Sequence, residues 1–159
     1  MIARFAMLAL ALWLCAFAAA AQAPAGAGQA PADYLDMQAA SAPYRAYADH
    51  WIALARAGDV DALARTISPA MAARAGAEAV RRNLATRVVP FFAQSTGVGK
   101  SVTVTRTTDA SGHQGFAFYM YAQPKDGAPR PFVLYVVDEG GTKVVANIVV
   151  DHFVPDRHK

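Results

Sequence analysis

The spacing of apolar residues changes from a helical period to an alternating one near Gly97. Before this glycine, aromatic and aliphatic residues recur every three or four positions, which is typical of helices with one buried face. After it, apolar and polar residues alternate, which is typical of strands. The pattern therefore predicts an α+β domain, in which N-terminal helices pack on a curved antiparallel sheet formed by the C-terminal half.

Several helices are predicted ahead of the sheet. The first covers residues 43–57, where aromatic and aliphatic side chains form one apolar stripe. Asp59 is a suitable N-cap for a short second helix, and Ser68-Pro69 is a start signal for a third. A longer helix over residues 77–94 follows, and we expect Pro90 to kink or shorten it.

Four strands are predicted in the remainder of the chain, over residues 101–108, 115–123, 131–139 and 142–153. The segments between them are short and rich in Gly, Pro and Asp, which suits hairpin turns. We therefore expect a four-stranded antiparallel meander.

A two-residue Gly-Gly loop predicts the register of the last two strands. It places Asp138 opposite Lys143 and Leu134 opposite Asn147. Both faces of this hairpin are then apolar, whereas a sheet covered by helices on one side normally has a polar opposite side. We expect a partner subunit to cover the second face, or the sheet to curl around a cavity. One face carries Phe132, Leu134, Val136, Val145, Asn147 and Val149, and the other carries Val133, Tyr135, Val137, Val144, Ala146 and Ile148.

The N-terminus has the pattern of a signal peptide. Arg4 precedes an uncharged apolar run over residues 5–17, which as a helix is too short for a bilayer core of roughly 30 Å. The small residues 18–21 suit cleavage, so residues 1–21 are predicted to be removed. We expect a periplasmic protein without membrane attachment after cleavage, with an extracellular fate left open. Cys15 lies in this segment, so the mature domain lacks disulfides.

The rest of the chain is predicted to form one domain. Residues 22–40 are interpreted as a flexible Ala/Pro/Gly linker, residues 41–155 as a single α+β domain, and residues 156–159 as a tail. The formal net charge is +3 and the basic residues are dispersed along the chain. Nucleic-acid binding needs a clustered basic surface, so we exclude that class of partner.

One segment resembles a known family. ALARAGDVDALARTISPAM follows an aromatic-bearing helix and precedes a further helix and a long-stranded sheet. This order is similar to the nuclear transport factor 2-like superfamily, in particular its small exported bacterial members, over most of residues 43–154. The resemblance implies a cystatin-like, cone-shaped fold with a pocket at its open end and frequent dimers through the sheet. Its members include ketosteroid isomerase-like and polyketide cyclase-like enzymes as well as binding modules, so it leaves the function open.

Two polar residues are candidates for the pocket. Asn147 is predicted on the buried face, where it either lines a pocket or is a core or rim amide with satisfied hydrogen bonds. His50 lies one helical turn from Tyr47, so its ring either reaches the inner side as an acid or base or lies on the water-facing flank.

Phenols concentrate on the predicted strands, at Tyr119, Tyr121 and Tyr135, and suit either a ligand or a dimer surface. An isomerase of the resembling family needs a carboxylate inside the cone, yet the acidic strand residues fall at strand ends. We therefore assign no catalytic set. The candidate pocket consists of Tyr47, His50, Tyr119, Leu134 and Asn147.

No metal or cofactor is predicted, because the four histidines lack compact ligand spacing and no phosphate-binding glycine loop is present. The sequence favours a non-catalytic domain that binds a small apolar ligand or a protein partner and forms a homodimer through its sheet. The alternative is an isomerase, cyclase or dehydratase-like enzyme that uses His50, Tyr119 and Asn147 around a hydrophobic pocket.

Overall fold

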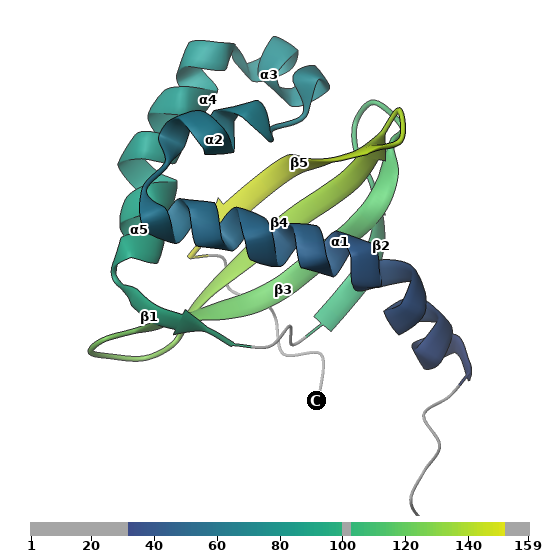
Figure 1. Cartoon of the computed structure of the whole chain (residues 1–159), viewed down its shortest axis with the longest axis horizontal. Coiled ribbons are helices and arrows are strands. Elements are labelled where there is room, and N and C mark those ends of the chain that lie inside the picture. Colours follow the sequence, from purple (N-terminus) through teal and green to yellow (C-terminus); the bar gives the residue numbers. More distant parts are fainter. Residues whose placement is uncertain (1–31, 100–102, 152–159) are drawn as a thin grey trace, which may run out of the picture. The chain divides into compact units, whose positions relative to one another are not determined.

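The computed structural model describes residues 32–99 and 103–151. These residues form a layer of helices on one face of an open, five-stranded antiparallel sheet (Figure 1). The α+β class is therefore confirmed, and the predicted number of four strands is wrong. The predicted signal peptide, the predicted tail and residues 22–31 of the predicted linker lie outside the described residues.

Helix α1 (Ala32–Ala57) crosses the helix-covered face of the sheet, called the front face from here on (Figure 1). It begins well before residue 43, so residues 32–40 are helical and Pro43 lies inside the helix. A proline removes one backbone donor from the helix interior. The buried stripe of α1 outweighs this loss, because Trp51 is fully buried against Phe92 with ring centroids 6.3 Å apart.

Helices α2 (Val60–Arg65) and α3 (Pro69–Ala75) begin at the predicted caps. The Asp59 carboxylate accepts a hydrogen bond from the backbone N–H of Ala62 at 2.9 Å. The Ser68 hydroxyl accepts one from the N–H of Met71 at 3.3 Å, and Pro69 needs no partner at the first helical position. Both predicted helix starts are confirmed.

The predicted helix over residues 77–94 consists of α4 (Ala77–Asn83), a π-helical turn η1 (Leu84–Val88) and α5 (Val89–Ala93). In the π-turn, the N–H of Val89 donates to the carbonyl of Leu84, one residue further back than in an α-helix. The turn directly precedes Pro90, whose ring would clash with a carbonyl of a regular preceding turn. The expected interruption near Pro90 is confirmed in this form.

Strands β3 and β4 form the centre of the sheet, and β5 is one edge. Strands β1 and β2 follow each other along the opposite edge of β3. The missed strand is β1, a four-residue segment with a central glycine and no alternating pattern. The bounds are Ser95–Val98 for β1, Thr103–Thr108 for β2, Gln114–Pro124 for β3, Arg130–Glu139 for β4 and Thr142–Val150 for β5.

The register of the last hairpin is confirmed near the turn and wrong beyond it. Asp138 pairs with Lys143 as predicted, with Gly140 and Gly141 at φ of 64° and 86° in the turn.

Ala146 is an extra residue, a β-bulge, so Asn147 pairs with Tyr135 instead of Leu134. Asn147 is therefore exposed and not on the buried face. Ile148 takes its place opposite Leu134 and packs against the core.

The bulge follows the point where the connection between α2 and α3 pairs with β5. Ile67 forms a parallel bridge with Val145. The N–H of Ser68 donates to the Val145 carbonyl, and the Val145 N–H donates to the Thr66 carbonyl, both at 2.9 Å. Both outward backbone groups of Val145 are thus satisfied. The buried Ser68 hydroxyl also donates to the Glu139 carboxylate at 2.9 Å.

Apolar residues are buried on both faces of the sheet, as the sequence predicted. The main core lies between the helices and the front face, and includes Phe132, Leu134 and Val136. A smaller cluster of Val137, Val144 and Ala146 lies on the opposite face, called the back face, with Tyr135 packed against it.

Gly115 on β3 is a position where the strands leave no room for a side chain. A Cβ there would overlap the Val136 carbonyl and come within 2.6 Å of the Val137 Cα. We expect Gly115→Ala to lower the free energy of unfolding by about 1–3 kcal/mol, because β4 must move away. Chemical denaturation measures this loss.

The matched control is Gly97→Ala on β1, where a Cβ would meet no heavy atom within 4 Å and φ is not positive. We expect this variant to retain wild-type stability. Equal effects of the two substitutions would contradict the tight approach of β3 and β4.

Candidate binding groove

Two cavities meet at the β5 edge of the sheet. The back cavity has a volume of about 370 Å³ and the front cavity about 280 Å³. Met71 and Ala75 of α3 and Asn147 of β5 line both cavities. We treat the two as one feature, the β5 groove, which extends around the edge of the sheet.

The back cavity has an apolar floor and a polar rim. Its floor consists of Tyr135, Val137 and Ala146 on the back face. Arg74 of α3 lies on one side. The other side is formed by Thr107 and Thr108 at the end of β2 and by Asp109 and Ala110 in the turn that follows.

Most of the residues that line the front cavity have apolar side chains. It separates β5 from α4 and η1, and among the described residues that line it only Asn83 and Asn147 have polar side chains. Its remaining walls are Ile67, Met71, Ala75, Ala79, Val80, Leu84 and Ile148. The groove therefore combines an apolar half with a half that offers hydrogen-bonding groups and one cation.

Asp109 holds the turn between β2 and β3. Its Oδ1 accepts hydrogen bonds from the N–H groups of Ser111 and His113, both at 2.8 Å, and its Oδ2 lies 3.0 Å from His113 Nδ1. Burial raises the pKa of Asp109, but the hydrogen bonds from the His113 ring and from the two backbone N–H groups outweigh burial and lower it. The Asp109 carboxylate is thus ionised at neutral pH, and both of its oxygens are hydrogen-bonded within the turn.

Tyr135 places a phenol on the floor of the groove. Burial raises its pKa, and the charge of Tyr119 and the hydrogen bond with Tyr119 raise it further. Tyr135 is therefore protonated at neutral pH and presents a neutral hydroxyl, not a phenolate, to a ligand.

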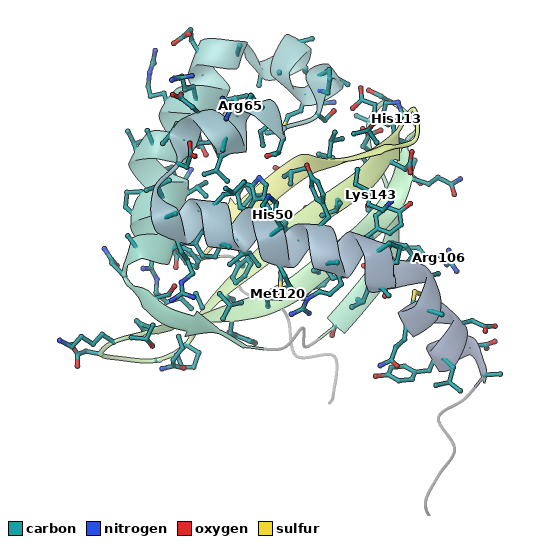
Figure 2. The ribbon with its side chains drawn as sticks, in the orientation of Figure 1. His50, Arg65, Arg106, His113, Met120 and Lys143 are labelled. Atoms are coloured by element: carbon teal, nitrogen blue, oxygen red, sulfur yellow. The ribbon has the colours of Figure 1, made fainter. Side chains whose placement is uncertain are left out.

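The structure does not bring the five predicted pocket residues together. His50 is exposed on α1, far from His113 at the hairpin end of the sheet (Figure 2). Tyr47 lies on the same helix, with its hydroxyl 3.5 Å from the Thr66 carbonyl, and burial raises its pKa.

The other three predicted pocket residues lie on strands. Leu134 is fully buried in the main core. Tyr119 lies on the back face beside Tyr135, and Asn147 alone of the five lines the groove.

The sequence did not predict most of the groove residues as site residues, and Met71, Arg74, Ala75 and Asp109 are among those missed. The Ser68-Pro69 signal predicts the start of α3, but not that α3 lies beside β5. The DASGH turn predicts a hairpin, but its contact with the groove depends on how the sheet bends.

Another hollow, with a volume of about 540 Å³, lies between α2 and α4. Its charged side chains are exposed and engage each other: Arg81 pairs with Asp61, and Asp59 caps α2. Such a solvated charged surface has few apolar contacts for a ligand.

Neither a metal-binding cluster nor a membrane-spanning helix occurs in residues 32–99 and 103–151. These residues contain no group of three or more His, Cys, Asp or Glu side chains arranged to hold a metal ion. None of the described helices combines the length and the hydropathy needed to span a bilayer.

Comparison of the chain with protein-family models, curated proteins and solved structures yields no match. The resemblance to the nuclear transport factor 2-like superfamily therefore stays a prediction.

Asp109→Asn tests the turn that borders the groove. The pKa of Asp109 is lower in the folded chain than in the unfolded chain, where it is near 3.9. The ionised carboxylate therefore stabilises the folded state fully at pH values above about 3.9, and this stabilisation is lost as the pH falls through the pKa of the folded state. We expect the variant to lose about 1 kcal/mol at pH 7, with the difference from wild type shrinking below about pH 4. Thermal unfolding across this pH range measures it.

Asp126→Asn, at an exposed position in the turn between β3 and β4, is the control and should leave the melting temperature unchanged. A loss for Asp109→Asn that is independent of pH would contradict the role of the ionised carboxylate.

Proposed function

We propose that this chain is an exported, non-catalytic binding domain of the cone-shaped nuclear transport factor 2-like class, and that its β5 groove holds an apolar ligand. The ligand is a small apolar molecule or an apolar segment of a partner protein. The composition of the groove carries the proposal: apolar walls with a few converging polar groups, at Arg74, Tyr135 and Asn147. Binding sites typically have this composition and volumes from roughly 300 Å³ upward.

The periplasm is the proposed location. Its support is the sequence of residues 1–21, where Arg4, the apolar run and the small residues follow the order of a cleavable signal peptide. These residues lie outside the described part of the chain.

The alternative enzyme requires His50, Tyr119 and Asn147 around one pocket. His50 is exposed on α1, Tyr119 lies on the back face, and Asn147 is at the β5 edge. The one carboxylate among the groove residues, Asp109, is engaged by His113. These observations favour the non-catalytic proposal.

A second candidate function is self-association through the back face. The centre of this face, residues 117, 119 and 121 of β3 and residues 133, 135 and 137 of β4, carries no carboxylate, ammonium or guanidinium group. Its three tyrosines are half-buried and supply apolar area together with hydroxyl groups. We propose, as the alternative to a ligand in the back cavity, that a second copy of the chain covers this surface, including the groove floor at Tyr135 and Val137.

Anilinonaphthalene sulfonate is a suitable probe for the groove, since its rings match the apolar walls and its sulfonate matches Arg74. We expect the wild-type protein to bind it with a rise in fluorescence. Ala75→Trp should abolish binding, because Ala75 lines both cavities and the indole fills the space between them. Fluorescence titration measures the affinity.

Ala73→Trp adds the same side chain to an exposed position of α3 that lines neither cavity, and it should bind the probe as wild type does. The groove proposal fails if the two variants behave alike, or if wild type does not bind.

Sedimentation equilibrium tests the second candidate. We expect a wild-type dimer, and a monomer for Tyr121→Lys, because a buried ammonium without a partner opposes association. Ala53→Lys on the exposed surface of α1 should remain dimeric. A wild-type monomer at the highest concentration reached excludes this assembly.

A further inference from the structure

The edge of β5 has free backbone groups beyond the bulge. In an antiparallel ladder, residues alternate between pairing with the neighbouring strand and pointing their N–H and C=O outward. Val145 points outward, and both of its groups bond to the connection between α2 and α3. Continuing the alternation past the Ala146 bulge, Ile148 is the next outward-pointing residue. No hydrogen bond from a described residue reaches its outward groups.

The β5 groove lies on both sides of this edge. Its front cavity is lined by Ile148 and by Val80 and Leu84 of the opposing helices, while its back cavity is lined by Tyr135 and Ala146. A strand added beside β5 would point successive side chains alternately to the front and to the back. One extended segment can therefore fill both cavities.

The charges around the groove indicate which side chains a bound extended segment should carry. Arg74 has no ion-pair partner among the described residues, and the front cavity contains no charged side chain. Among the described residues of the groove, Asp109 alone carries a carboxylate, and it is engaged by His113. An acidic residue at the Arg74 end and apolar residues along the front side complement this distribution.

We propose that the β5 groove binds an extended, apolar peptide segment of a partner protein, which adds to the sheet at Ile148 and carries an acidic residue facing Arg74. This inference rests on the groove being a binding site, and it identifies the ligand as a peptide. Strand addition supplies affinity through backbone hydrogen bonds, and the two cavities supply specificity through alternate side chains.

The probe is a fluorescein-labelled peptide, Glu-Val-Ser-Val-Ser-Val, with valines for the front cavity and the glutamate for Arg74. Fluorescence anisotropy with the full chain measures its binding. Two further versions carry backbone N-methyl groups, one on the odd residues and one on the even residues. We expect only one of these versions to lose binding, because every second N–H of an added strand faces β5.

Charge exchange tests the contact with Arg74. Replacing the glutamate of the peptide by lysine should weaken binding to wild type about two- to five-fold, as expected for one exposed ion pair. Arg74→Glu should reverse the preference, since Arg74 is exposed and its replacement leaves the core intact. Ala73→Glu on the same helix, away from the groove, should leave the preference unchanged.

The outcomes separate the peptide proposal from the proposed function. If anilinonaphthalene sulfonate binds in the groove and no peptide does, the peptide proposal is overturned and the groove remains a binding site. If both methylated peptides bind as well as the parent, strand addition is excluded. If neither the dye nor the peptides bind, both proposals fall.

Discussion

The two backbone hydrogen bonds of Val145 with Thr66 and Ser68 determine how the helices meet the sheet. The edge of a sheet exposes unpaired donors and acceptors, and proteins normally cover or interrupt it. Here the connection between α2 and α3 covers the first part of the β5 edge, and the buried Ser68 hydroxyl fixes the same connection to Glu139. Since Ser68 is also the N-cap of α3, this contact sets where α3 starts and brings Met71 and Ala75 to the edge of the sheet.

The bulge at Ala146 then decides which side chains of β5 face the core. An insertion of one residue exchanges the faces of every residue that follows it, because side chains alternate along a strand. Ile148 thereby joins the core in place of Asn147, and the Asn147 amide lies at the exposed edge. A regular hairpin would have buried an amide among apolar residues, which costs stability unless it finds partners.

The features that the sequence predicts correctly depend on residues close together in the chain. Asp59 and Ser68 cap the helices that follow them, Gly140 and Gly141 form the last turn, and the stripe of Val80, Leu84, Val88 and Phe91 is buried. The features that it does not predict depend on distant segments. Strand β1 forms only because β3 extends past β2, Pro43 is tolerated because α1 packs on the sheet, and the bulge accompanies pairing with residue 67. Of the five predicted pocket residues only Asn147 lines the groove, because Tyr47 and His50 lie on α1, Leu134 is buried in the core, and Tyr119 lies on the back face outside the groove.

The groove exists because small residues occupy the helix surface that faces β5. Ala75 and Ala79 line it where leucine or methionine would fill it, and Gly76, at φ of 85°, turns the chain between α3 and α4. Larger side chains would bury more apolar surface and would stabilise the domain by roughly 25 cal/mol for each Å² removed from water. The outward backbone groups of Val145 bond to residues 66 and 68, whereas those of Ile148, three residues later, have no partner among the described residues. The domain therefore forgoes stabilisation at this part of the sheet edge. The ligand site that we propose at this edge requires such a local departure from full packing.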